Sequence, residues 1–251
     1  MTDAESPILI VSDLHLGSMM ARVKELTAFL ASEPFHTLIL NGDILDSPNL
    51  KFLTAEHWKF LLFLKRLAED GKEIVWISGN HDGHARNLFK TLGLKTKMHY
   101  LFEWNGKKCL AIHGHQYDRF LIENRIMATT INRSYRLIQK MDKKEKNVSR
   151  FVKTRYKKWL RVSSRVAKGA IKFGTKKGVD YVFCGHTHEK LAMKLGHVHY
   201  LNSGSWSEKE CHYILLKDGH AKIGTVGMQF PLEMKIPYKI EKTDFIEKSV
   251  V

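Results

Sequence analysis

Short apolar runs alternate with helical patterns through the first 113 residues of the chain. The runs Pro7–Ser12, Thr37–Asn41 and Glu73–Ser78 consist mostly of Ile, Leu, Val and Trp and predict buried strands. Between them, Ala21–Ala31 and Thr54–Asp70 carry apolar residues at helical spacing. Strands that alternate with helices in this way predict a layered α/β fold.

The second half of the chain continues with strand-like runs but offers fewer helices between them. These runs are Met98–Trp104, Lys108–Ile112, Val179–Cys184, His197–Asn202, His212–Lys217 and Ala221–Val226. Turn signals such as Asn105-Gly106 and Asp218-Gly219 separate neighbouring runs, which favours antiparallel pairing. No internal repeat or low-complexity segment is visible. The length allows one large domain or two small ones, and we expect a single domain over residues 1–251.

One amphipathic helix is predicted between Val148 and Phe173. Its apolar stripe is formed by Val148, Val152, Tyr156, Trp159, Val166 and Ala170. A basic stripe is formed by Lys153, Lys157, Arg161, Arg165, Lys168 and Lys172. At about 100° per residue the two stripes lie on opposite faces. The basic face is then either solvated, or directed at an anion or a membrane surface.

Composition excludes several classes of protein. Apolar residues make up 43% of the chain, which is enough for a full core and argues against disorder. No stretch approaches the roughly 18 apolar residues of a membrane-spanning helix. The first ten residues lack the basic start of a signal peptide, and three scattered cysteines do not make a disulfide framework. We therefore expect a cytoplasmic protein.

The charge of the chain is concentrated in one segment. The formal net charge is +15, from 41 Lys and Arg against 26 Asp and Glu. Residues 119–178 alone contain 19 basic and 3 acidic residues, a net charge of +16, so the rest of the chain is close to neutral. A basic insert on a neutral body predicts an anionic partner such as nucleic acid, an anionic membrane or a phosphorylated substrate.

Five polar motifs each follow a strand-like run. They are Asp13-Leu14-His15, Gly42-Asp43, Gly79-Asn80-His81-Asp82, His113-Gly114-His115 and Gly185-His186-Thr187-His188. In open α/β sheets functional groups gather beyond the carboxyl ends of the strands, so the five loops are expected to meet in one crevice. A single motif of this kind is often a coincidence, but five in the same position predict one site.

The side chains in these motifs are suited to divalent metal ions. Carboxylates, an amide and imidazoles favour Mn²⁺, Fe²⁺ or Zn²⁺, and the lack of thiolates argues against a structural zinc. Two ions about 3.5–4 Å apart form the recognised clamp for displacement at phosphorus. One carboxylate must then bridge the ions, and Asp43 has the best position for it.

Taken in order, these motifs resemble those of the calcineurin-like metallophosphoesterase superfamily over roughly residues 8–206. The resemblance implies a four-layer αββα sandwich with a helical insert at about residues 119–178. It also implies a centre for two divalent ions. Mn²⁺ is the expected ion, and Fe or Zn would fit the same ligands. By motif, the first ion is assigned to Asp13, His15, Asp43 and His188. The second ion is assigned to Asp43, Asn80, His113 and His186.

The same resemblance assigns catalytic roles within the GNHD motif. His81 is expected to be the general acid that meets the leaving group without binding metal. Asp82 is expected to hydrogen-bond His81 and hold its orientation. Further candidates for substrate contact follow from their position beside the motif loops: Asn49, Arg86, His115, Asp118 and Arg119.

Within the superfamily the chain is similar to the UDP-2,3-diacylglucosamine pyrophosphatase family of lipid A synthesis. The total length, the insert between the HGH and GHTH motifs and the stretch Leu201–Trp206 carry this likeness. This likeness implies an insert that covers the acyl chains of the substrate. It also implies an enzyme that hydrolyses a lipid-linked substrate at the inner face of a membrane. Two positions depart from that family, His81 in place of Arg and His115 in place of Asp. A sister branch with a different phosphodiester therefore stays open.

Two other interpretations remain at this stage. The basic insert could follow the phosphate backbone of a nucleic acid, with Tyr135, Tyr156 and Trp159 as stacking surfaces, although no nucleic-acid module is visible. A metal-binding scaffold without activity is the third interpretation. The presence of every expected ligand and of the histidine acid argues against it.

Overall fold

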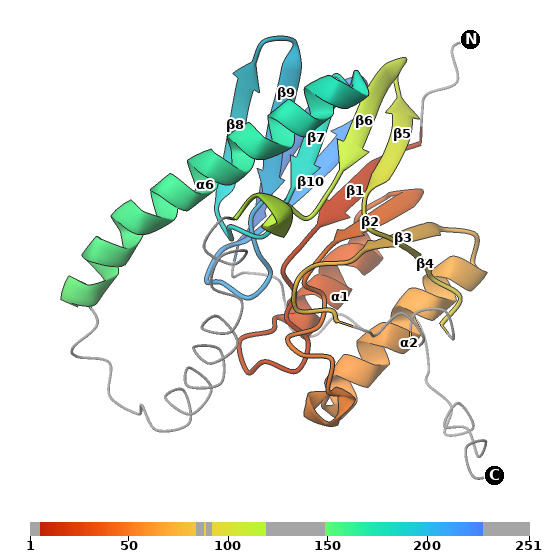
Figure 1. Ribbon diagram of the computed structural model, residues 1–251. Helices are drawn as coiled ribbons and strands as arrows, with labels where there is room; N and C mark the ends of the chain where they lie inside the picture. The colour runs from red at the N-terminus through yellow and green to blue at the C-terminus, as the bar shows by residue number, and fades with distance from the viewer. Residues whose placement is uncertain (1–5, 84–87, 89–91, 119–148, 228–251) are drawn as a thin grey trace.

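Two β-sheets lie between two layers of helices in the computed structural model (Figure 1). The structure describes residues 6–83, 88, 92–118 and 149–227, and it describes only the backbone of residues 149–161. Most of the first part of the basic insert therefore falls outside the described residues.

The first sheet is built around parallel strands. These are β1 (Ile8–Val11), β2 (Thr37–Asn41), β3 (Glu73–Ile77) and β4 (Lys95–Lys97). Beside β1, the sheet is extended by β10 (Cys211–Lys217) and β11 (His220–Val226), each antiparallel to its neighbour. The order is β11-β10-β1-β2-β3-β4. Helices α1 (Val23–Ser32) and α2 (Ala55–Glu69) make the crossovers that parallel pairing requires.

The second sheet mixes parallel and antiparallel pairs. Its strands are β5 (Tyr100–Trp104), β6 (Lys107–Ala111), β7 (Tyr181–Cys184), β8 (Lys190–Leu195) and β9 (Val198–Ser203). Their order is β5-β6-β7-β9-β8, with β6, β7 and β9 parallel. The crossover from β6 to β7 contains the basic insert and ends with helix α6 (Ser149–Lys177).

Alternating side chains of the strands divide the apolar core into three parts. In β1, Leu9 and Val11 join the core under α1 and α2, whereas Ile8 and Ile10 point into the core between the sheets. In β7, Val182 joins the third core, beneath α6. Because successive residues of a strand face opposite sides, a run that is apolar at every position fits a strand covered on both faces. The layers are thus helix, sheet, sheet, helix, which confirms the expected αββα sandwich.

The predicted elements agree with the structure except at two sheet edges. Strands β4 and β8 were not expected, because both lie at an edge and carry several exposed lysines instead of an apolar run. Two short 3₁₀ helices, η1 (Leu50–Phe52) and η2 (His115–Tyr117), were also not expected.

Helix α6 confirms the amphipathic prediction wherever its side chains are described. Ala170 is buried against the second sheet and Val166 is buried near Gly114, whereas Arg165, Lys168 and Lys172 are exposed. The earlier members of both stripes fall outside the described side chains. Among the described helices, none is long and apolar enough to cross a membrane.

Candidate metal centre

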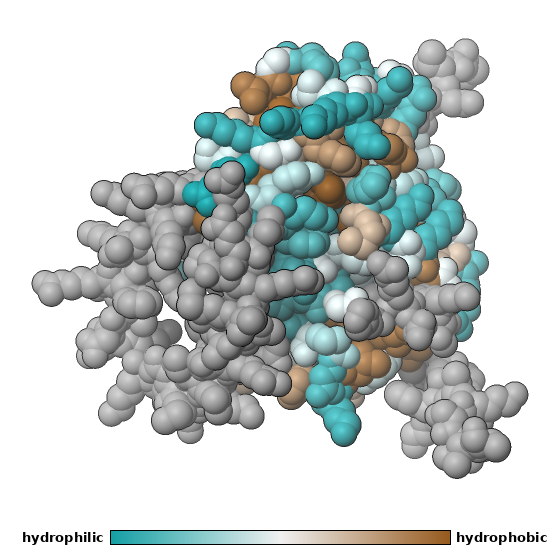
Figure 2. Space-filling model, in the orientation of Figure 1, coloured by the Kyte–Doolittle hydropathy of each residue, from teal (hydrophilic) through white to brown (hydrophobic). Residues whose placement is uncertain are grey.

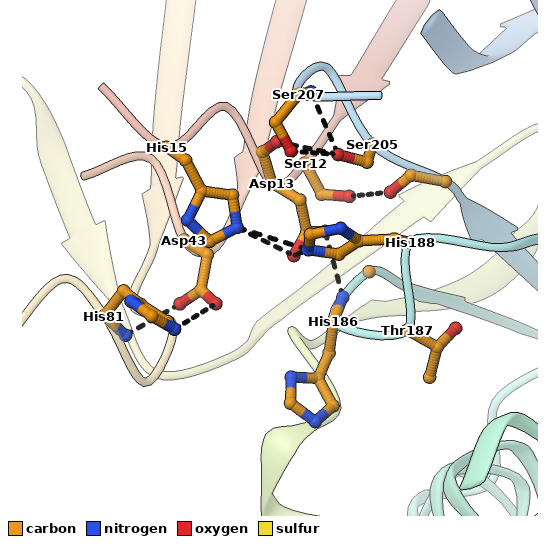
Figure 3. A network of polar contacts seen from close by, with 12 residues as sticks. Ser12, Asp13, His15, Asp43, His81, His186, Thr187, His188, Ser205 and Ser207 are labelled. Carbon is orange, nitrogen blue, oxygen red and sulfur yellow. Dashed lines mark hydrogen bonds and ion pairs between the residues drawn. The ribbon is translucent and has the colours of Figure 1, made fainter. Parts of the chain in front are cut away.

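The five predicted motif loops meet at the carboxyl ends of β1, β2, β3, β6 and β7. Figure 3 shows side chains from the DLH, GD, GNHD and GHTH motifs there. The backbone there is unusual: seven non-glycine residues of the described chain have positive φ, and five belong to this site. These five are Asp13, His15, Asp43, His186 and His188. Such conformations are uncommon for residues with a Cβ and persist where the surrounding structure enforces them, often at functional sites. The strain marks the loops as positioned by the fold.

One group of possible ligands, here called the first cluster, consists of Asp13, His15 and His188. The Nε2 atoms of His15 and His188 are 3.2 Å apart. His188 Nε2 lies 3.3 Å from Asp13 Oδ1, and the other oxygen of Asp13 accepts a hydrogen bond from the backbone of His186. Two imidazole nitrogens that face each other beside a carboxylate form an arrangement that a shared cation would satisfy.

A second group, the second cluster, consists of Asp43, His113 and His186. His113 Nε2 lies 3.3 Å from Asp43 Oδ2, and Asp43 Oδ1 accepts a hydrogen bond from the backbone N–H of His81 at 2.8 Å. His113 is completely buried and Asp43 nearly so. Asn80, the seventh predicted ligand, is exposed and adjoins His81 in the same loop.

Three imidazoles of the two clusters are held from outside by an oxygen atom. His113 Nδ1 donates to the carbonyl of Asn41 at 2.8 Å, and His188 Nδ1 donates to Glu208 at 3.3 Å. His186 Nε2 donates to Asp118 at 3.1 Å. Because a carbonyl or an ionised carboxylate can only accept, each contact leaves the other nitrogen of a neutral ring with its lone pair. Partners of this kind orient metal-binding histidines in proteins.

The electrostatics of both clusters call for positive charge. Burial alone would raise the pKa of Asp13, but His188 and His113 outweigh it and lower that pKa to about 2. The pKa of His113, which burial alone would lower, is raised to about 9 by Asp43 and Asp13. Burial would also lower the pKa of His188, but Asp13 outweighs it and raises that pKa to about 10. Without another cation, the carboxylates therefore hold protons on these two imidazoles.

Unsatisfied buried atoms provide a test of whether a metal ion fits. Among the described residues, Asp13 Oδ1 and His113 Nε2 are two of the buried side-chain atoms without a hydrogen-bond partner, although His188 Nε2 lies 3.3 Å from the first and Asp43 Oδ2 lies 3.3 Å from the second. Unpaired buried polar atoms are costly, and here they are an oxygen and an imidazole nitrogen in the two ligand clusters. The donor set fits divalent ions.

Glycines make the close approach of the loops possible. A Cβ at Gly42 would overlap the ring of His113, and one at Gly79 would overlap the carboxylate of Asp43. A Cβ at Gly185 would meet the side chain of Asp13. Glycine is therefore required where these motif loops cross one another.

The predicted hydrogen bond between Asp82 and His81 is wrong. Asp82 is buried and instead accepts hydrogen bonds from the backbone of Asp43, Leu45 and Gly79 and from the indole of Trp76. His81 Nδ1 bonds to the carbonyl of Asp46 at 3.0 Å. The unpaired backbone donors at the ends of β2 and β3 require an acceptor, and Asp82 fills that need. Its carboxylate thus joins two motif loops.

The predicted substrate contacts have different surroundings. Asn49 is exposed, and its side chain caps η1 by accepting from the backbone of Lys51. His115 begins η2, with its ring centre 5.4 Å from that of His113. Asp118 is buried against His186. Arg86 and Arg119 lie outside the described residues.

Two carboxylates near the histidines were not predicted from the sequence. Asp46 Oδ1 lies 3.5 Å from His15 Nδ1, and Asp46 also forms a third group of possible ligands with His15 and His81. Glu208 accepts from His188, and this hydrogen bond lowers the pKa of Glu208. The only sequence signal for them is an acidic residue shortly after the GD motif and another shortly after Trp206.

The stretch after the last motif ties the loops together from behind. Ser205 Oγ and the backbone N–H of Trp206 both donate to the carbonyl of Asp13. Asn202 donates to the carbonyl of Gly185 and to the hydroxyl of Thr187. These bonds hold the strained DLH and GHTH loops in register with each other.

The comparison with protein families identifies this arrangement. The family model for calcineurin-like phosphoesterases matches residues 6–190, so the chain belongs to that family. It is a metal-dependent hydrolase, as the motifs predicted, and the family typically binds divalent metals. No curated protein sequence matches the chain significantly.

Several solved structures are similar to this chain at low sequence identity. A novel archaeal phosphodiesterase is 16% identical, with a TM-score of 0.50 over 88% of this chain and 98% of that one. A conserved Streptococcus pneumoniae TIGR4 protein, described as a predicted phosphoesterase, is 18% identical, with a TM-score of 0.44 over 88% and 89%. Vacuolar protein sorting 29 from Cryptosporidium parvum is 13% identical, with a TM-score of 0.49 over 89% and 98%.

Proposed function

We propose that this chain hydrolyses a phosphodiester or pyrophosphate bond with two divalent ions, one in each ligand cluster. The observation that carries the proposal is the pair of clusters, each with one buried aspartate and two imidazoles. Of these four imidazoles, three donate a hydrogen bond to an oxygen atom outside the clusters. Ions in this position would supply Lewis-acid activation of the phosphoryl group and of the attacking water. Mn²⁺ is the proposed ion, with Fe and Zn suited to the same ligands.

Asp43 is the proposed bridge between the clusters. Its carboxylate touches His113 of the second cluster, and it also lies 3.9 Å from His81 Nε2. In Figure 3 it lies below His15 of the first cluster and beside His81. Burial alone would raise the pKa of Asp43, but the nearby imidazoles, above all that of His113, keep that pKa well below the ordinary value. Asp43 is thus an ionised ligand at the middle of the site.

His81 is the proposed acid for the leaving group. Its Nδ1 donates to the carbonyl of Asp46, so Nε2 is the nitrogen that faces the site. The side chain is partly exposed, and its ring centre lies 5.0 Å from that of His15. A protonated Nε2 there can donate to an oxygen that departs from phosphorus, and the carbonyl fixes the direction of that donation.

We propose a nucleotide-sugar lipid similar to UDP-diacylglucosamine as the substrate, bound at the inner face of an anionic membrane. The basic face of α6 supports an anionic partner, because Arg165, Lys168 and Lys172 all point away from the body. Figure 2 shows hydrophilic side chains over the described part of this helix. Phosphate groups of a substrate or of lipids would find charge complementarity there.

Nucleic acid is the second candidate for the anionic partner of the basic insert. The net charge of +16 in residues 119–178 suits a phosphate backbone as well as it suits a lipid headgroup. The two candidates differ in salt dependence, because a polynucleotide that contacts several lysines and arginines releases many counterions.

The test starts with a generic substrate and then separates the candidates. Purified full-length protein should hydrolyse bis(p-nitrophenyl) phosphate with added Mn²⁺ and lose this activity with EDTA. UDP-2,3-diacylglucosamine should then release UMP, measured by chromatography, whereas labelled single-stranded DNA or RNA should stay intact. Cleavage of the polynucleotide without UMP release would establish the second candidate. If the protein hydrolysed none of these substrates, the proposed function would be wrong.

A further inference from the structure

His186 is anchored differently from the other histidines of the two clusters. His113 and His188 use Nδ1 to donate to their anchors, which leaves Nε2 directed into the site. His186 instead uses Nε2, which donates to Asp118 Oδ2 at 3.1 Å. Its Nδ1 is then the ring atom with a free lone pair. Figure 3 shows the ring directed away from Asp13 and His188.

Asp118 is a rigid partner for this contact. It is buried, and it directly follows η2, where its backbone N–H donates to the carbonyl of His115. The helix starts after Gly114, whose φ of 109° allows the turn out of β6. Asp118 therefore reaches His186 from a short, tightly turned element and not from a flexible surface loop.

Helix α6 fixes η2 from the other side. The backbone of Gly169 in α6 approaches Tyr117 so closely that a Cβ at this position would overlap the ring. Val166 of α6 packs in the same way near Gly114. The elements on either side of the undescribed part of the chain, η2 before the basic insert and α6 at its end, are thus packed together directly behind the second cluster.

We propose that Asp118 is a positioning residue that selects Nδ1 of His186 as its metal-binding atom and so sets the affinity of the second cluster. The inference rests on the proposed two-ion centre, but it concerns ion binding and not turnover. It replaces the expectation that Asp118 contacts substrate, because the carboxylate is buried against the ring of a candidate ligand. A carboxylate behind a ligating imidazole typically changes metal affinity by about 10–100-fold when it is removed.

The first experiment is Mn²⁺ titration of the metal-free full-length protein, with free Mn²⁺ followed by its electron paramagnetic resonance signal. The variant Asp118→Ala should weaken one of the two bound equivalents by about 10–100-fold. Asp118→Asn should keep most of the affinity, because its amide oxygen still accepts from Nε2–H. Circular dichroism should show that both variants remain folded.

A matched variant identifies which cluster is affected. Glu208→Ala removes the equivalent anchor from His188 in the first cluster. In a His188→Ala background, Asp118→Ala should still weaken Mn²⁺ binding, whereas Glu208→Ala should have no further effect. Unchanged affinity for both equivalents in Asp118→Ala would overturn the inference. A raised KM for bis(p-nitrophenyl) phosphate with unchanged Mn²⁺ affinity would also overturn it, because Asp118 would then contact the substrate and not set metal affinity.

A second measurement needs no substitution at Asp118. Long-range ¹H–¹⁵N correlation spectra of the metal-free wild-type protein at pH 8 distinguish the two neutral tautomers of an imidazole. The spectra should show His186 with its proton on Nε2. A proton on Nδ1 instead would contradict the inference even if the alanine variant failed to fold. A chain that passes both tests but hydrolyses no phosphodiester would contradict the proposed function alone.

Discussion

The two ligand clusters have similar chemistry but differ in how they are enclosed. In the second cluster, His113 is fully buried and is anchored by a main-chain carbonyl of β2. In the first cluster, the side chain of His188 is 23% exposed, and its anchor Glu208 is 56% exposed. Interactions with exposed groups are weaker, because water and salt screen them. Each cluster has two buried ligands, Asp13 and His15 in the first and Asp43 and His113 in the second, so the difference lies in the third histidine and its anchor, which are more exposed in the first cluster than in the second.

This difference leads to an expected order of ion binding and release. An ion in the second cluster would be held by the buried side chains of Asp43 and His113 and by His186, whose anchor Asp118 is also buried, so we expect its release to require movement of the strand ends. An ion in the first cluster could leave after a partly exposed imidazole swings aside. We therefore expect the first cluster to exchange its ion faster and to lose it first to a chelator.

The largest effect is expected where the clusters join. Asp43→Asn should lower kcat/KM for bis(p-nitrophenyl) phosphate by at least about 10³-fold, or ~4 kcal/mol, because the two clusters lose the carboxylate that is proposed to bridge them. The fold should persist, since asparagine tolerates the φ of 51° at this position. Activity is measured at saturating Mn²⁺.

Asp218→Asn is the matched control for that substitution. Asp218 also has a positive φ, 49°, but it lies in the turn between β10 and β11. Its substitution should leave activity unchanged. A similar loss in both variants would trace the effect to the backbone and not to the metal centre.

The next effect concerns the acid and should depend on the leaving group. His81→Ala should lower turnover by about 10²-fold for a substrate with a poor alkoxide leaving group, because no proton reaches the departing oxygen. With p-nitrophenolate, which departs without a proton, the loss should be much smaller. Mn²⁺ affinity should change little in either case. An equal loss for both leaving groups would show that His81 does not act as the acid.

Much of this site follows from the sequence, because it depends on local patterns. The strands are visible in the sequence as apolar runs. The polar residues just beyond Val11, Asn41 and Cys184 could be placed together at the carboxyl ends of the strands from the expected topology alone. The anchors could not be found in this way. Asp118 and Glu208 reach their histidines from other parts of the chain, and the Asn41 carbonyl has no side-chain signal at all. The predicted role of Asp82 in the GNHD motif is wrong, because the side chains of residues that are neighbours in sequence need not contact each other.

A smaller effect should appear when the exposed anchor of the first cluster is removed. Glu208→Ala removes the carboxylate that accepts from His188 Nδ1 and should weaken one Mn²⁺ equivalent by about tenfold. The remaining equivalent should keep the wild-type affinity, because its ligands do not touch Glu208. Stopped-flow chelation should show the fast phase of ion release accelerated and the slow phase unchanged. Acceleration of the slow phase alone would reverse the proposed assignment of the two clusters.

The last prediction uses protons to compare the clusters. The pKa of His113 is about 9 and that of His188 about 10, so each cluster holds one protonated imidazole at pH 7 in the metal-free protein. Metal ions bind neutral imidazole, so uptake must displace both protons. Affinity should then fall about tenfold per cluster for each pH unit lowered below pH 9.

Calorimetric titration in buffers of different ionisation enthalpy measures these protons, and about one per Mn²⁺ equivalent is expected at pH 7. The same shifts predict the stability of the metal-free protein. Both folded pKa values lie above the ordinary value for histidine, so their contribution is fully present below about pH 6.5 and is lost as pH rises through 9 and 10. Urea unfolding of the metal-free protein should accordingly show lower stability at pH 10 than at pH 7. Mn²⁺ uptake that releases no protons at pH 7 would mean that the ions do not displace the protons of His113 and His188, and that neither cluster binds metal through these two imidazoles.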